Sequence, residues 1–244
     1  MSPNFIGKAR HLNQLAFSTL KSMGKRKVFC IGINKTGTTS IVKAFTELGL
    51  IIGEQRLAER LLYDWARRDF SRLFLYCHTA QAFQDIPFSL PFTFQALDQH
   101  FPGSKFILTI RDNPEQWYNS RINFYSVVFA NGHPPTLEDL RASSYVHPGW
   151  LYEANRLINN TPVDDPFNKE LLIASYNAHN AAVMEYFRHR TQDLLVLNVA
   201  TSGAYDQLCD FLEKPRTGKE FPWENRTANI TGPSKTHPAN ARRD

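Results

Sequence analysis

The chain has 244 residues, of which 42% are hydrophobic and 21% charged, and its formal net charge is +5. This composition is that of an ordinary globular protein, and the length fits one α/β domain with a sizeable core. No apolar run approaches the roughly 18 residues that a membrane-spanning helix needs, so the sequence predicts no membrane span. The basic residues are spread along the chain, which argues against nucleic-acid binding and leaves an anionic small ligand or an acidic partner.

The three cysteines, Cys30, Cys77 and Cys209, are far apart in the sequence. Their odd number and their apolar or helical surroundings predict reduced thiols in or near the core, and not a disulfide or a metal site. No grouping of His, Cys and Glu has metal-ligand spacing. The N-terminus has no apolar segment of the kind that signal peptides contain. We therefore expect a cytoplasmic protein without a bound metal.

The first part of the chain predicts one helix, one strand and a second helix. Residues 1–26 form a basic segment with weak apolar periodicity, for which we expect a short N-terminal helix. The continuous apolar run 28–33 is typical of a buried parallel strand. Apolar positions over residues 41–48 then follow helical spacing, and Gly49 is a natural stop.

The middle of the chain is less clearly patterned. We expect a polar helix over about 54–69, a strand over 73–77, a loop over 81–91 and a helix near 92–100. The run 105–110 predicts a further strand. Asn113 and Pro114 then form a strong helix start, because Asn caps a helix and Pro suits its first position. This helix is expected to reach about residue 130.

The remaining elements complete an alternating pattern. Residues 131–149 are rich in Gly and Pro and predict mostly loop. A long helix is expected over 167–190, a strand over 194–198 and a helix over 203–213. Alternating strands and helices predict an α/β fold in three layers, with a central parallel sheet flanked by helices. We expect one domain over residues 27–230 and a flexible tail over 231–244.

The most informative motif follows the first predicted strand. Gly32 and Gly37 have the glycine spacing of a Walker A loop, but Thr38 stands where that loop has its lysine, and the lysine is displaced forward to Lys35. A strand, a glycine-containing loop and a helix N-terminus form a ready anion site, because the helix dipole favours negative charge there. The alternative interpretation is a tight turn whose lysine points into water.

The run 32–40, Gly-Ile-Asn-Lys-Thr-Gly-Thr-Thr-Ser, resembles the 5′-phosphosulfate loop of the sulfotransferase family, and in particular of its bacterial-type members. In that family the loop holds the 5′ end of 3′-phosphoadenosine-5′-phosphosulfate (PAPS), and the fold is a P-loop-type α/β sheet. The resemblance implies donor contacts from these loop residues: Asn34, Lys35, Thr36, Gly37, Thr38, Thr39 and Ser40.

The resemblance also implies a second anion site, after the predicted strand 105–110. In the family an Arg at a strand end and a Ser on the next helix hold the 3′-phosphate, and Arg111 and Ser120 are similar. Their separation of nine residues is one residue longer than is common in the family, so Asn119 is the alternative to Ser120, which we favour. Two other interpretations remain open for Arg111 and Asp112: a Walker B strand whose acid binds magnesium, and a helix-capping ion pair.

A third resemblance lies near the C-terminus. Residues 211–215 and 221–225 look like the end of bacterial-type members, where this region closes over the nucleotide. The resemblance suggests Lys214, Arg216 or Lys219 as a further contact to the 3′-phosphate. A solvated basic loop is the alternative.

The chemistry implied by the resemblance is in-line transfer of a sulfuryl group from PAPS to an acceptor hydroxyl or amine, which releases adenosine 3′,5′-bisphosphate. The transferring group carries less charge than a phosphoryl group, so a lysine and helix amides can suffice without a metal. Lys35 would stabilise charge on the bridging oxygen, while Arg111 and Ser120 would position the donor.

An acceptor hydroxyl needs a general base, and family members place His or Glu after the second strand. Here that stretch holds His78 and Asp85. We favour Asp85 as the base, the alternatives being a turn residue at Asp85 and a structural histidine at His78. His179 is near the apolar face of a predicted helix, and we expect it in the core or lining the substrate pocket.

The acceptor is not identified by the sequence; a small molecule, a carbohydrate and a lipid all remain open. Loops 78–92 and 131–165 are expected to shape its pocket. Several aromatic residues could stack on the acceptor or belong to the core: Phe88, Phe92, Trp117, Tyr125, Tyr145 and Trp150.

Three other functions are compatible with parts of the pattern. A P-loop kinase or NTPase with a deviant Walker A would bind ATP and magnesium, but Thr38 in the lysine position argues against it. A non-catalytic nucleotide-binding module would need neither Asp85 nor His78. A nucleic-acid-binding protein would show steep salt dependence. The sequence gives no indication of the oligomeric state.

Overall fold

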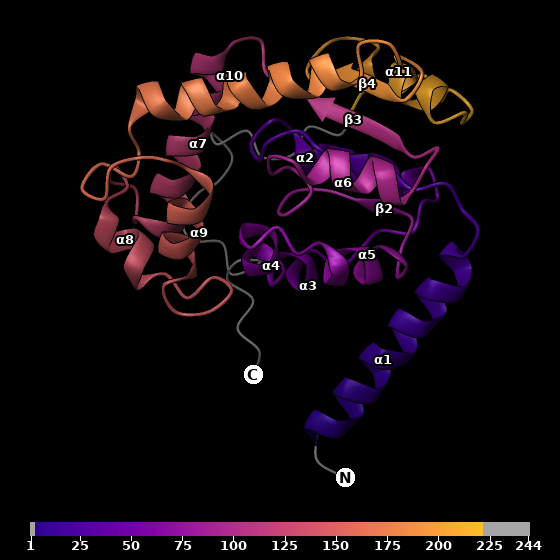
Figure 1. Ribbon diagram of the computed structural model, residues 1–244, viewed down its shortest axis with the longest axis horizontal. Helices are drawn as coiled ribbons and strands as arrows, with labels where there is room; N and C mark the ends of the chain where they lie inside the picture. The colour runs from indigo at the N-terminus through magenta and orange to yellow at the C-terminus, as the bar shows by residue number, and fades with distance from the viewer. Residues whose placement is uncertain (1–2, 222–244) are drawn as a thin grey trace.

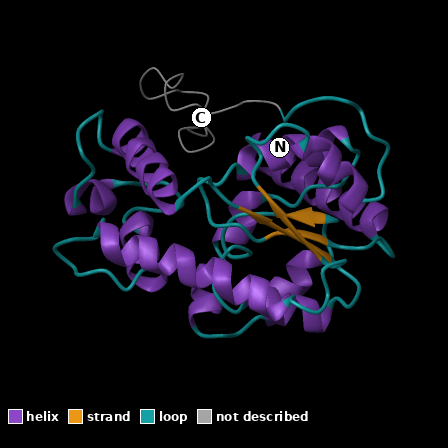
Figure 2. Cartoon of the chain, turned by 90° about the horizontal axis from the view of Figure 1, so that it is seen from above, coloured by secondary structure: helices purple, strands orange, loops and turns teal. Residues whose placement is uncertain are grey.

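The computed structural model describes residues 3–221, with side chains described from residue 13 onward. Its centre is a parallel sheet of four strands in the order β2-β1-β3-β4. The strands are β1 (Val28–Cys30), β2 (Ala82–Phe83), β3 (Lys105–Thr109) and β4 (Leu194–Leu197). Figure 2 shows the sheet from above, enclosed by helices on its sides. The predicted strands at 28–33, 105–110 and 194–198 are thereby confirmed, each with a shorter range.

Both faces of the sheet are covered, because alternate residues of each strand point to opposite sides. Phe29 and Phe106 pack against one cluster of buried residues, to which α3 (Gln55–Glu59), α5 (Ser71–Cys77), α6 (Thr93–His100) and α10 (Lys169–Tyr186) contribute. Cys30 and Ile107 face the other cluster, with α2 (Thr38–Glu47) and α11 (Ala204–Phe211). The predicted α/β architecture of three layers, with a central parallel sheet, is confirmed.

The prediction of a strand over 73–77 is wrong. These residues belong to α5, in which Leu73, Tyr76 and Cys77 are buried while Leu75 is 70% exposed. Burial at positions i, i+3 and i+4 is the helical period, which a short apolar run conceals. The strand instead lies at β2, within the region predicted as loop, and has only two residues.

The regions 54–69 and 131–166 also differ from prediction. The single expected helix over 54–69 is two short helices, α3 and α4 (Leu62–Ala66), because the chain turns at Arg60 and Leu61. The predicted loop contains α8 (Leu137–Ala142), and α9 (Trp150–Ile158) follows it without having been predicted. Gly149 caps α9 with φ 78°, so the Pro–Gly pair that suggested loop in fact precedes a helix.

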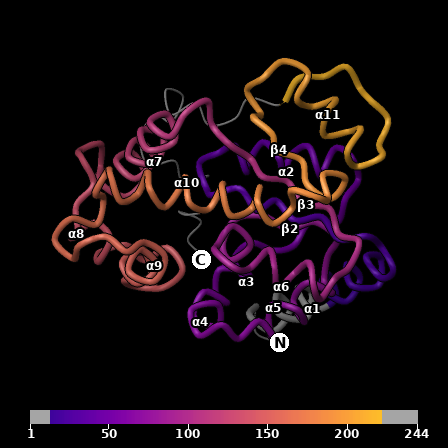
Figure 3. Tube along the Cα trace, turned by 45° about the horizontal axis from the view of Figure 1, so that its top comes forward, coloured from indigo at the N-terminus to yellow at the C-terminus, as the bar shows by residue number. Residues whose placement is uncertain are grey.

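Helices α8 and α9 form a further layer beside the sheet, and α4 packs against it. A third cluster of buried residues joins α4, α8 and α9, and includes Leu62, Leu140, Trp150 and Ala154. Figures 1 and 3 show α7, α8 and α9 together at one side of the molecule, with the long α10 running from them along the sheet. The N-terminal α1 (Pro3–Ser22) extends away from the body in Figure 1.

Helix α7 (Pro114–Phe129) connects this layer to the sheet. The Asn113 side chain accepts a hydrogen bond from the backbone N–H of Gln116 over 2.8 Å, and Pro114 is the first helical residue, as the sequence predicts. Trp117 of α7 stacks on Tyr176 of α10 with ring centroids 4.7 Å apart. The predicted tail 231–244 and residues 222–225 lie outside the described residues. In the described part of the chain, no helix combines the length and apolar character that crossing a bilayer requires.

Candidate active site

The strand order determines where a ligand can bind. The chain goes from β1 to β2 on one side and then returns past β1 to β3, so the direction of winding reverses between β1 and β3. Ligands of open α/β sheets bind at such a point, beyond the carboxyl ends of the strands. The residues that follow β1, β2 and β3 at this edge include Lys35, Asp85 and Arg111.

The loop after β1 is held tightly against β3 and the chain after β4. A Cβ at Gly32 would lie 2.1 Å from Oγ1 of Thr109, and a Cβ at Gly37 would lie 2.4 Å from Cγ2 of Val199. Gly37 also has φ 103°, in the left-handed region that favours glycine. The two glycines of the motif are therefore required by close packing and backbone geometry, and the loop can take only one path.

Thr36 stabilises this loop from inside. Its buried hydroxyl donates to the carbonyl oxygen of Ile33 over 2.6 Å and lies 2.6 Å from Oγ1 of Thr109. Its side chain does not line the cavity described below. Thr36 was predicted to contact the sulfuryl donor. With its hydroxyl used inside the loop, only its backbone N–H remains for such a contact. Asn34, Lys35, Gly37, Thr38, Thr39 and Ser40 do line the cavity.

Lys35 has φ 74°, in the left-handed region that is uncommon for a residue with a side chain. Its Nζ lies 3.6 Å from the centroid of the Phe124 ring, a cation–π contact. Burial lowers the pKa of Lys35 to about 8; the charge of Asp85 opposes this shift, and Arg111 and Arg121 add to it. The ammonium is thus partly desolvated and close to other cations, a setting in which an anion is strongly favoured.

Arg111 follows β3 and is tied to the loop. Its Nε donates to the carbonyl oxygen of Lys35 over 2.7 Å, and its backbone N–H donates to Oη of Tyr176 over 3.1 Å. Burial lowers its pKa. No described residue accepts a hydrogen bond from its two terminal nitrogens, and Arg111 lines the same cavity as the loop. A fixed guanidinium with a free fork of donors suits bidentate binding of an oxyanion.

Ser120 and Asn119 are distinguished by their position on α7. Ser120 lines the cavity, whereas Asn119 is exposed and does not. This placement supports the preference for Ser120 over Asn119.

Asp85 follows β2, in the left-handed region with φ 61°. Its Oδ1 accepts a hydrogen bond from the backbone N–H of Ile86 over 2.9 Å. Burial raises the pKa of Asp85; the hydrogen bond from Ile86 and the charges of Lys35 and Arg121 act in the opposite direction. Asp85 lines the cavity with Lys35, so a carboxylate of increased basicity lies on the wall shared with the loop.

The other candidate base is placed elsewhere. His78 is the exposed residue at the C-terminal end of α5, where its ring lies edge-on to Phe101. It is not among the residues that line the cavity. His179 does line it: the ring is buried, with Nε2 2.9 Å from the carbonyl oxygen of Ile31. Burial lowers the pKa of His179, while the hydrogen bond to Ile31 acts in the opposite direction, so burial favours the neutral ring.

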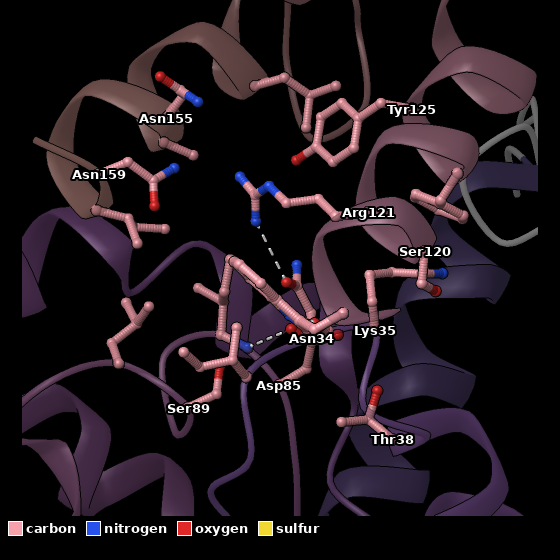
Figure 4. Close-up of a pocket in the computed structure, with 18 of the residues that line it drawn as sticks. Asn34, Lys35, Thr38, Asp85, Ser89, Ser120, Arg121, Tyr125, Asn155 and Asn159 are labelled. Carbon is pink, nitrogen blue, oxygen red and sulfur yellow. Dashed lines mark hydrogen bonds between the residues drawn. The ribbon is translucent and has the colours of Figure 1, made fainter. Parts of the chain in front are cut away.

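Together these residues surround a cavity of about 190 Å³. Lys35, Thr38 and Ser120 lie toward one part of it in Figure 4, and Arg121, Tyr125, Asn155 and Asn159 lie toward another. Six polar residues of the cavity were not predicted as site residues: Glu59, Ser89, Arg121, Asn155, Asn159 and Ser175. The structure thus joins two regions, one rich in loop residues and one lined by α7 and α9.

A family model for the sulfotransferase domain matches residues 27–230 of the chain. The chain belongs to the sulfotransferase domain family. It is therefore a transferase of the class that moves sulfuryl groups, and the resemblance found in the loop extends over most of the chain. No curated protein sequence matches it with significant similarity.

The geometry of this sulfotransferase also bears on the Walker B interpretation of Asp112. Its two carboxylate oxygens accept hydrogen bonds from Asn198 over 2.5 Å and from Gln116 over 2.9 Å, and Asp112 does not line the cavity. Asp112 thus orders the start of α7. Among the described residues, no group of three or more His, Cys, Asp or Glu side chains could hold a metal ion.

The C-terminal basic residues of the sulfotransferase lie away from this cavity. Arg216 forms an ion pair with Asp210, with Nε 2.7 Å from Oδ1. Neither Arg216, Lys214 nor Lys219 lines the cavity. The residues beyond 221 that resemble the closing segment lie outside the described part.

The aromatic residues considered for the acceptor divide into two groups. Trp117, Tyr125, Tyr145 and Trp150 line the cavity of the sulfotransferase. Phe88 is buried in the core beside β1, and Phe92 is exposed outside the cavity. All three cysteines are buried and free, as predicted.

Proposed function

We propose that this sulfotransferase uses PAPS as its donor and transfers the sulfuryl group to an acceptor hydroxyl. The observation that carries the proposal is the meeting of Lys35, Arg111 and Asp85 at one cavity, each from the end of a different strand. Lys35 and Arg111 are cations on a rigid loop and strand end, which suits a ligand with anionic groups at two places. Asp85 is an acceptor of protons on the same wall.

The loop residues and Lys35 would hold the 5′-phosphosulfate, with the N-terminus of α2 directed at the same group. Arg111, through its terminal nitrogens, and Ser120, through its hydroxyl, would hold the 3′-phosphate. In support of this division, Arg111, Ser120 and all of the named loop residues except Thr36 line the cavity. The hydrogen bond from Arg111 to the Lys35 carbonyl supports this division, because it would hold the two proposed phosphate sites at a constant separation.

In the proposed reaction the bond between sulfur and the bridging oxygen breaks, and a bond between sulfur and the acceptor oxygen forms. The electron pair of the broken bond remains on the bridging oxygen, where the Lys35 ammonium stabilises it. The proton of the acceptor hydroxyl passes to Asp85. The raised pKa of Asp85 increases its strength as a base relative to an exposed carboxylate.

The test is calorimetric titration with adenosine 3′,5′-bisphosphate and, separately, with ATP and magnesium. Wild type, Lys35→Ala and the control Lys25→Ala, an exposed lysine near β1, are compared. We expect the bisphosphate to bind wild type and Lys25→Ala equally. Lys35→Ala should bind it at least about tenfold more weakly, because hydrogen bonds to charged groups contribute roughly 1.5–3 kcal/mol. Tight binding of ATP with magnesium, without binding of the bisphosphate, would overturn the proposal.

We also propose that the protein is cytoplasmic, as the sequence leads us to expect. The support for this location is the three buried, unpaired thiols, which suit a reducing compartment.

A further inference from the structure

Arg121 is a buried cation that the proposed donor site does not use. It is 6% exposed and lines the cavity from α7. Its Nη1 lies 3.5 Å from Oδ1 of Asn34, a long contact, and its Nε has no hydrogen-bond partner. Its guanidinium carbon lies 5.2 Å from the ring centroid of Tyr125 and 5.9 Å from that of Trp117. No carboxylate in the described part of the chain forms an ion pair with it.

Two further hydrogen-bond donors of the same cavity are buried and unsatisfied. Trp150, which is 2% exposed, has no partner for its indole Nε1, and Asn159, which is 6% exposed, has none for its Nδ2. Both line the cavity and come from α9 or its C-terminal end. In Figure 4 the guanidinium of Arg121 and the amides of Asn155 and Asn159 face the same open space.

The unsatisfied atoms of Arg121, Trp150 and Asn159 share one chemical property. Each is a nitrogen that donates a hydrogen bond, so each needs an acceptor atom from the ligand. An arginine stays protonated in proteins, and an indole nitrogen can only donate. Leaving a buried charge without a counter-charge is costly. The ligand group that complements this set is therefore an oxyanion, which accepts hydrogen bonds and neutralises the guanidinium.

Arg121 contacts the proposed donor loop through the long hydrogen bond to Asn34, but its side chain leaves α7 in another direction than that of Ser120. Ser120 precedes it on α7, and successive residues of a helix point about 100° apart. Figure 4 shows the two side chains directed to different sides. Asp85 is near enough for the charge of Arg121 to act on it, but the two side chains form no ion pair. An acceptor can thus present a hydroxyl to Asp85 and a second group to Arg121.

We propose that Arg121, Trp150 and Asn159 bind an acidic group of the acceptor, so that the acceptor is a hydroxylated acid with a carboxylate, phosphate or sulfate. The inference rests on the proposed sulfuryl transfer only for the role of the hydroxyl. Tyr125, Phe129 and Tyr145 line the space between these groups and provide apolar walls for the body of the molecule.

The experiment measures binding of matched probes to the full chain by calorimetry, with and without saturating adenosine 3′,5′-bisphosphate. The probes are 4-hydroxybenzoate, 4-hydroxyphenylacetate and 3-(4-hydroxyphenyl)propanoate, each paired with its neutral amide. The proteins are wild type, Arg121→Gln, Arg121→Lys, Asn159→Ala and the control Arg60→Gln, an exposed arginine outside the cavity. Circular dichroism shows whether each variant is folded.

We expect wild type and Arg60→Gln to bind at least one acid about tenfold or more tightly than its amide, as for a hydrogen-bonded charge pair. Arg121→Gln should lose this preference while its affinity for the bisphosphate stays within about twofold of wild type. Arg121→Lys should retain part of the preference. Asn159→Ala leaves the charge of Arg121 in place and should reduce the preference for the acid over its amide. This variant replaces Arg121→Gln in the test if Arg121→Gln does not fold.

Two results would overturn the proposal. One is equal binding of every acid and its amide to wild type in both nucleotide states. The other is a loss of bisphosphate affinity in Arg121→Gln as large as the loss of acid affinity, which would assign Arg121 to the sulfuryl group of the donor. If wild type prefers the acids but never binds the bisphosphate, the acidic-group site stands and the proposed donor fails.

Discussion

The side chain of Arg111 donates from Nε to the carbonyl oxygen of Lys35 over 2.7 Å. This hydrogen bond joins the end of β3 to the loop after β1, and it uses the one nitrogen of the guanidinium that a phosphate would not need. The two terminal nitrogens of the guanidinium have no acceptor among the described residues, and Arg111 lines the cavity. Residues predicted to bind two different phosphates are thus held as one unit.

Arg111→Gln should abolish selectivity for the 3′-phosphate. Wild type should bind adenosine 3′,5′-bisphosphate more tightly than adenosine 5′-monophosphate, and the variant should reduce this ratio by about 10- to 100-fold, because a bidentate charged contact is lost. Calorimetry with both nucleotides provides the ratio. Arg141→Gln, which changes an exposed arginine of α8, is the control and should behave as wild type. An unchanged ratio in Arg111→Gln would place the 3′-phosphate elsewhere.

Asp85→Asn should reduce kcat by about 10²-fold or more, which is the usual contribution of a positioned general base. Its affinity for adenosine 3′,5′-bisphosphate should stay near that of wild type. Transfer of label from PAPS to a panel of phenols gives kcat, and His78→Asn serves as the matched comparison, since His78 is exposed outside the cavity. Wild-type turnover in Asp85→Asn, or a large loss in His78→Asn, would contradict the assignment of the base.

The pH dependence of kcat follows from the same carboxylate. A base must be ionised to accept a proton, and burial raises the pKa of Asp85 above the usual carboxyl range, which is near 4. Activity should therefore be full where Asp85 is ionised and Lys35, whose pKa is about 8, still carries its proton. It should fall as the pH drops through the raised pKa of Asp85, at a higher pH than for an exposed carboxylate. A profile of kcat that stays flat from pH 8 down to pH 4 would contradict a role for ionised Asp85.

Gly37→Ala should lower the free energy of unfolding by about 2 kcal/mol or more, through a left-handed backbone strained by a Cβ and an overpacked contact. That Cβ would lie 2.4 Å from Val199. Gly49→Ala is the control, because Gly49 shares the positive φ, at 72°, but has open space around it. The control should lose only about 1 kcal/mol. Urea denaturation of both variants measures the difference, and equal losses would show that the contact with Val199 is unimportant.

Glu59→Gln should increase the free energy of unfolding relative to wild type, and this gain should be larger at pH 8 than at pH 5. Glu59 is 4% exposed, and burial, with the charge of Asp85, raises its pKa to about 7 in the folded state. Because the pKa of Glu59 is higher in the folded state, its protonated form stabilises the fold. This contribution is fully present below the unfolded pKa, near 4.5, and is lost as the pH rises through 7. The difference in unfolding free energy between variant and wild type should grow by about 2 kcal/mol between pH 5 and pH 8.

This difference is measured by urea denaturation at the two pH values. Glu138→Gln, at the exposed start of α8, is the control and should show no such change. The hydrogen bonds that Glu59 accepts from Tyr145 over 2.9 Å and Arg56 over 3.0 Å can be kept in part by glutamine. A difference that does not depend on pH would mean that Glu59 stays ionised.

Several features were predictable from the sequence because they depend on local patterns. The apolar run before Gly32 and the cap at Asn113 determine β1 and the start of α7, and both are found as expected. The loop residues and Arg111 reach the cavity because they follow parallel strands directly. What was not predictable depends on tertiary packing, as with β2, whose two residues carry no periodicity of their own.

The side chains along the acceptor part of the cavity were missed for a related reason. Arg121 lies four residues from both Trp117 and Tyr125 on α7, and this spacing places it on the inner face of the helix. That spacing was the available signal, but a charged residue is usually assigned to the exposed face. Asn159 depends on α9, which the preceding Pro and Gly concealed, and Glu59 lies in a segment that was expected to be a polar helix.

Ser120 and Arg121 are neighbours on one helix, yet they face different parts of the cavity. Whatever fixes the tilt of α7 for one ligand fixes it for the other, so the affinities of the two substrates are thermodynamically linked. Linkage is reciprocal: if the nucleotide changes the affinity for the acceptor by some factor, the acceptor changes the affinity for the nucleotide by the same factor. We therefore expect any coupling between the affinities for the nucleotide and the acceptor to depend on the position of α7, the helix that carries both Ser120 and Arg121.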